Sequence, residues 1–106
     1  MFGNLQNIIQ DVTSGNTDPQ QLEQSASEHV SQMGGDELAQ HLQTAAQNAQ
    51  NNGQPDVAQD LMSMVSQRSA DPERLKQDAV SYIKSNPQVV TQFAPEFAQG
   101  ILKKFL

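Results

Sequence analysis

The side chains that could take part in metal or acid–base chemistry are few: His29 and His41, and the glutamates Glu37 and Glu96. Metal ligands on one helix share a face when they lie three or four residues apart. The two histidines lie twelve residues apart across a Gly-Gly break, so we predict no metal site. The two glutamates could act as acid and base if they were brought close together. An acid early in a helix more often complements the helix dipole, so we predict no catalytic residue and no enzyme.

Other reaction centres are excluded by residue type. The chain has no cysteine, which rules out disulfides, thiol chemistry and cysteine-ligated zinc. No glycine-rich loop follows a strand, so there is no phosphate-cradling motif. Serines are common, but none has a positioned histidine and acid that would make it a nucleophile. We therefore expect no cofactor.

The formal net charge of −6 is unevenly spread. Eight acids and no lysine or arginine precede Arg68, while six bases and four acids follow from there on. Nucleic-acid binding needs several basic groups on one face, and this chain does not supply them. The first residues have neither a basic group nor an unbroken apolar run, and no apolar stretch is long enough to span a membrane. We expect a soluble, acidic, cytoplasmic protein.

The elements that position these groups follow a repeated pattern. Asp18 to Val30 (DPQQLEQSASEHV) and Asp71 to Ile83 (DPERLKQDAVSYI) share Asp, Pro, Leu, Gln and Ala at the same offsets. At a longer offset, Glu37 to Leu42 matches Glu96 to Ile101. Matched positions keep their apolar character, as a duplication requires. Chance recurrence of helix caps in a Gln-rich chain is the alternative.

Apolar residues recur at helical spacing throughout, and no run alternates with a period of two. We predict an all-α fold: a single domain over residues 1–106, a compact bundle of six or seven short helices, built from two three-helix units of about 1–53 and 54–106. Asp18-Pro19 and Asp71-Pro72 begin two of the helices, and Asp36 is expected to cap a third. Met62 is expected to face the core and Met64 the solvent.

The C-terminal stretch is densely apolar, with Lys103 and Lys104 inside it. Its simplest role is to complete the core. It could also be a surface for a protein partner or for self-association. Shallow attachment to a membrane surface is a third alternative, for which two lysines are few. The residues of the possible interaction surface are Phe93, Phe97, Ile101 and Phe105.

Glu37 to Leu42, followed by Val57 to Gln67 (VAQDLMSMVSQ), resembles the small helical bacterial proteins of the YidB-like family. The resemblance covers about the middle third of the chain. It implies a bacterial protein with a helical fold. The family has no established activity, so the resemblance implies no site residue.

We predict a non-catalytic protein-interaction or scaffolding domain that can self-associate through the apolar C-terminal helix. The alternative is a carrier that holds a small apolar or lipid ligand between the two helical units. A carrier would have an apolar cavity among Leu61, Val65, Ile83 and Phe97.

Overall fold

The fold is all-α, as the sequence predicts. The computed structural model describes residues 7, 10–11, 14, 18–68 and 70–103. Within them lie five α-helices and one 3₁₀ helix: α2 (Pro19–Ser31), α3 (Gly35–Asn51), α4 (Pro55–Arg68), α5 (Pro72–Ser85), η1 (Pro87–Gln92) and α6 (Pro95–Leu102). Most of the first predicted helix lies outside the described residues.

Asp-Pro pairs begin α2 and α5. The Asp18 carboxylate accepts a hydrogen bond from the Gln20 backbone N–H at 3.0 Å, and the Asp71 carboxylate accepts one from the Arg74 N–H at 3.2 Å. A proline follows each cap at the first helical position, where no N–H is needed. The two predicted helix starts are confirmed.

The predicted cap of α3 is wrong. Gly34 is the N-cap, in an extended conformation, and Asp36 lies inside the first turn. Its negative charge there still favours the positive end of the helix dipole. A Cβ on Gly35 would lie 2.8 Å from the Pro72 Cβ, so glycine lets the starts of α3 and α5 approach closely.

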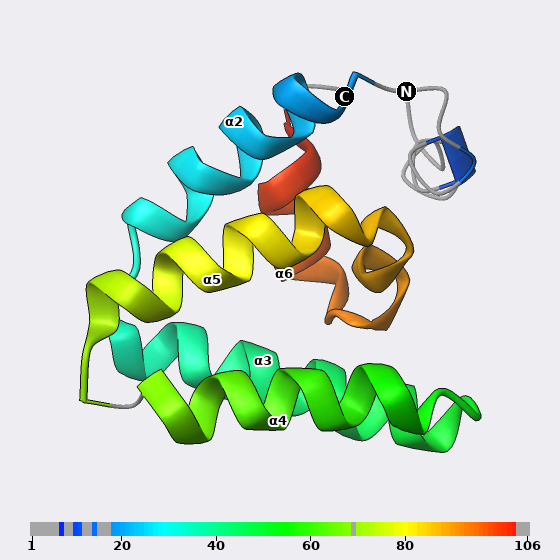
Figure 1. Ribbon diagram of the computed structural model, residues 1–106. Helices are drawn as coiled ribbons and strands as arrows, with labels where there is room; N and C mark the ends of the chain where they lie inside the picture. The colour runs from blue at the N-terminus through cyan, green and yellow to red at the C-terminus, as the bar shows by residue number, and fades with distance from the viewer. Residues whose placement is uncertain (1–6, 8–9, 12–13, 15–17, 69, 104–106) are drawn as a thin grey trace.

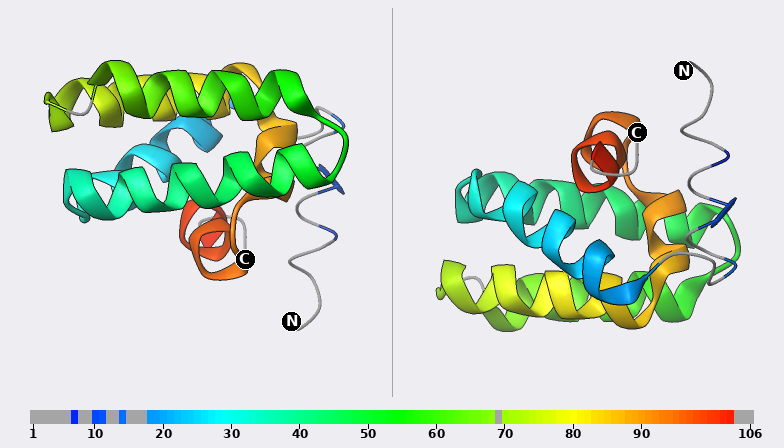
Figure 2. Two further views of the ribbon diagram at one scale, coloured as in Figure 1. Left: turned by 90° about the horizontal axis from the view of Figure 1, so that it is seen from below. Right: turned by 90° about the horizontal axis from the view of Figure 1, so that it is seen from above.

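The helices form two pairs with α6 against one side (Figure 1). α2 packs along α5, and α3 packs along α4. Figure 2 shows α6 and α5 on opposite sides of α2. Because α6 has only eight residues, its position depends on what α2 and α3 present to it.

Leucines, alanines and valines dominate the core. Alanine forms much of the α3 stripe, which lets α4 lie close. The largest fully buried side chains are Phe97, Leu22, Leu38, Leu42, Leu61, Leu75, Ile83, Ile101, Leu102, Val30 and Val89.

The expected orientation of the α4 methionines is wrong. Met62 is 46 % exposed, whereas Met64 is half-buried and packs against the core. The inward line of α4 runs through Ala58, Leu61 and Val65, at helical spacing. Met62 follows Leu61 by one residue, so it projects beside this line.

An amide network holds η1 at one end of the bundle. The Asn48 side chain donates to the Gln92 backbone carbonyl, and the Asn52 side chain donates to the Gln92 Oε1, both at 2.8 Å. Gln92 also donates to the Thr91 hydroxyl at 3.0 Å. Because its amide is buried and hydrogen-bonded, Gln92 can occupy the interior without a large desolvation cost.

Several matched apolar positions of the proposed repeat are buried in both copies. Leu22 and Leu75 are both buried, and so are Val30 and Ile83. The units differ in their third segment, where α3 has 17 residues and α6 has 8. The duplication stays a prediction, because equal burial also suits two unrelated amphipathic helices. Among the described residues, no helix has the length and hydropathy needed to cross a bilayer.

We predict that Leu22→Ala and Leu75→Ala lower the free energy of unfolding by similar amounts, about 2–5 kcal/mol each, because each leaves a cavity in the same core. Urea denaturation measures both losses. The matched controls are Gln24→Ala and Gln77→Ala at two exposed repeat positions, where changes within about 0.5 kcal/mol are expected. A near-neutral result at only one leucine would contradict equivalent roles.

Candidate functional site

The two histidines meet at Phe97, the buried aromatic residue of α6. The ring of His41, from α3, stacks on Phe97 with centroids 4.5 Å apart and planes 17° apart. The ring of His29, from α2, lies at 5.2 Å with planes 55° apart. Phe93 meets Phe97 edge-on at 4.6 Å. The Phe97 side chain is 1 % exposed, so these rings enclose it almost completely.

One face of α2 supplies two contacts to α6. Ser25 and His29 lie four residues apart, which places them on the same side of the helix. The buried Ser25 hydroxyl donates a hydrogen bond to the Ile101 backbone carbonyl. That carbonyl belongs to the last turn of α6, and carbonyls in the last turn of a helix are commonly satisfied by groups outside the helix. Ser25 therefore caps the end of α6 from another helix.

Gly100 of α6 lies directly against His29 of α2. A Cβ added at Gly100 would overlap the His29 ring atoms. The imidazole thus lies flat against glycine backbone, a position that no other residue type would leave open. The contact fixes both the depth of α6 and the position of the His29 side chain.

Charges around the two imidazoles are mixed. The His41 Nε2 lies 3.9 Å from the Glu37 carboxylate, one helical turn earlier, and that carboxylate is 60 % exposed. Burial is the main cause that lowers the pKa of His29 below its ordinary value of 6.5, and the nearby positive charges of His41 and Lys103 lower it further. Glu37 acts in the opposite direction. The cluster therefore favours a neutral His29.

This arrangement suits packing better than catalysis. Among the described residues, no three histidine or acidic side chains gather where they could hold a metal ion. Glu37 lies beside His41, whereas Glu96 lies in the first turn of α6, where it complements the helix dipole. Both histidine rings contact Phe97, and His29 also lies against Gly100, so the two side chains form part of the seat of α6.

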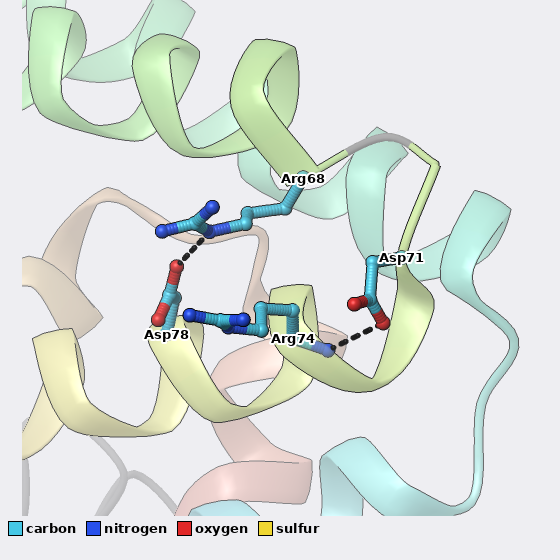
Figure 3. A network of polar contacts seen from close by, with 4 residues as sticks. All are labelled: Arg68, Asp71, Arg74 and Asp78. Carbon is cyan, nitrogen blue, oxygen red and sulfur yellow. Dashed lines mark hydrogen bonds and ion pairs between the residues drawn. The ribbon is translucent and has the colours of Figure 1, made fainter.

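A second polar cluster lies at the turn between α4 and α5 (Figure 3). The Arg68 Nε contacts the Asp78 carboxylate at 2.8 Å, and Asp71 caps α5 through the Arg74 backbone. Both side chains of the ion pair are more than one-third exposed. An exposed pair of this kind contributes about 0–1 kcal/mol. The cluster joins the ends of two helices and is not assigned a binding role.

Three of the four residues of the predicted interaction surface lie inside the fold. Phe93, Phe97 and Ile101 are buried, so the described structure places them in the core and a partner could reach them only if α6 moved. Phe105 lies outside the described residues. The four side chains predicted to line a carrier cavity are also buried, and none of them lines the grooves described below.

An open groove of about 670 Å³ runs between α3 and α4. Its lining contains no charged residue: Gln43, Ala46, Gln47, Gln50, Asn51, Pro55, Ala58, Gln59 and Met62. Three smaller grooves, of about 460, 210 and 280 Å³, all include at least one acidic residue. The α3–α4 groove is therefore distinguished by its size, its neutrality and its exposed methionine.

Sequence reasoning missed the histidine cluster because it considered ligand spacing along one helix. The contact joins the consecutive helices α2 and α3 to α6, which is distant from both in sequence. A signal for it was present: Gly100 interrupts an otherwise good helical pattern, and an isolated helical glycine often marks a close approach. Neither that glycine nor the histidine spacing identifies the approaching residue.

We predict that Gly100→Ala destabilises the protein by about 1–3 kcal/mol, although alanine is the better helix former. The reason is the overlap of the new Cβ with the His29 ring. In a double-mutant cycle measured by urea denaturation, the loss caused by Gly100→Ala is smaller in a His29→Ala background. Additive losses would contradict the contact. Gln99→Ala, at an exposed position of α6, is the control.

The chain was compared with known proteins in three ways. No family model matches it. No curated protein and no solved structure matches it either.

Proposed function

We propose that the chain is a non-catalytic protein-interaction domain that contacts its partner across the α3–α4 groove. The observation that carries this proposal is the exposed Met62 in the wide, uncharged groove. Met62 is the only large hydrophobic side chain that is exposed among the described residues. The position of Met62 supports a surface for partner binding on α3 and α4, and not one on α6.

The composition of the groove supports protein contact. The centres of protein interfaces are depleted in charged residues and enriched in methionine. Methionine is flexible and polarisable, so it adapts to different apolar partners. Ala46 and Ala58 are buried in the lining, and their small side chains leave the hollow that a partner side chain could fill.

The glutamines of the groove supply hydrogen bonds without charge. Gln43, Gln47, Gln50 and Gln59 are all exposed. Each amide can donate and accept, so a partner backbone could be bound in several registers. The resemblance to the YidB-like family adds no residue to this proposal, and membership of that family stays a prediction.

We predict that Met62→Glu abolishes partner binding and leaves the helical content unchanged. A buried anchor at the centre of an interface contributes about 2 kcal/mol or more, so the dissociation constant should rise at least about 30-fold. Affinity capture from the source cell, followed by titration with the purified partner, measures the effect. Light scattering over a range of protein concentrations tests whether the partner is a second copy.

The matched controls are Gln47→Glu inside the groove and Gln24→Glu on α2, both at exposed positions. The first should weaken binding because it places a charge in a neutral surface, and the second should not. Equal binding by Met62→Glu and the unchanged protein would refute the groove as the contact surface.

A further inference from the structure

We propose that α6 is an acid-sensitive latch: it docks most firmly while His29 is neutral and opens more often when that imidazole is protonated, which transiently uncovers Phe97, Ile101 and Leu102. The inference concerns a different part of the molecule from the α3–α4 groove and does not depend on the proposed function. It rests on how closely α6 is fitted to His29.

The His29 ring is closely packed against α6. The His29 ring lies against the Gly100 backbone on one side and near the Phe97 ring. An imidazolium needs hydrogen-bond acceptors or water around both ring nitrogens. Apolar ring and helix backbone replace part of that shell on one side of this half-buried residue, so the charged ring is hydrated less well while α6 is docked.

The charges around His29 mostly oppose its protonation. From α3 come His41, which opposes protonation, and Glu37, which favours it. From the end of α6 comes Lys103, which opposes it. The Glu37 carboxylate is well exposed and lies beside His41, so it compensates only weakly. A protonated His29 would therefore be repelled by the segment it helps to hold.

The direction of the pH dependence follows from the lowered pKa of His29. A group whose pKa is lower in the docked state binds fewer protons there than in the released state. Its contribution to docking is complete above about 6.5, its ordinary pKa, and is lost as the pH falls through the docked-state value. Acidification therefore favours release.

α6 is a short helix. Isolated helices shorter than about 12–15 residues are marginal in water, and α6 has eight. Its helical structure therefore depends on docking. The hydrogen bond from Ser25 to the Ile101 carbonyl involves no titratable group, so this second attachment does not respond to pH.

Amide hydrogen exchange of the whole chain tests the latch. Protection factors, corrected for intrinsic exchange, are compared between about pH 7.5 and about pH 5.5, across the range in which histidine titrates. In the unchanged protein, protection of Ala98 to Leu102 should fall several-fold more than protection of Ala79 to Ile83 in α5, and by about tenfold at most, which is the limit that linkage to one histidine sets over this pH range. An equal fall in both helices would overturn the proposal.

Two variants identify the responsible group. His29→Gln, neutral at both pH values, should lose the selective acid response of α6. His41→Gln removes one repelling charge and keeps His29, so the response should become smaller but persist. A full response in His29→Gln would also overturn the proposal. Circular dichroism at neutral pH verifies that each variant is folded. If His29→Gln is unfolded, the proposal is tested by comparing the acid-induced loss of protection in α6 and α5 of the unchanged protein.

Discussion

The packing of Phe97 is the interaction on which the arrangement of the C-terminal segment depends. One ring from α2, one from α3 and one from the segment before α6 surround it. α6 is too short to hold its own structure, so this enclosure both forms the helix and places it. The contact also closes the side of α2 opposite α5 (Figure 2), and thereby completes a core that contains few aromatic residues.

The parts of the fold that could be predicted are those that local physics determines. Asp-Pro pairs start helices because the Asp carboxylate accepts hydrogen bonds from free backbone N–H groups, and because proline lacks an N–H at a position where none is needed. Both predicted starts are confirmed. The cap at Asp36 and the orientation of Met62 were predicted wrongly. Each depends on a neighbouring helix. The start of α3 is determined by the close approach of Pro72 to Gly35. The residues of α4 that face inward are determined by its packing on α3 and α5.

The candidate sites could not be predicted from the sequence for the same reason. The histidine cluster joins positions far apart in the chain, so spacing along one helix contains no trace of it. The α3–α4 groove is formed by small alanines in its lining and by Met62 next to them. These residues lie on two helices, and the sequence does not determine how each helix is rotated about its axis. Apolar content alone left open whether the C-terminal helix completes the core or offers a surface; Phe97, its described aromatic residue, is buried.

The central claim is that a neutral His29 imidazole is part of the seat of α6. The most direct test is a proton NMR titration that follows the His29 ring together with the Gly100 amide. The account predicts that His29 titrates below 6.5, its ordinary pKa, and that the Gly100 resonance changes with the same midpoint. A midpoint at or above 6.5, with an unchanged Gly100 signal, would contradict it.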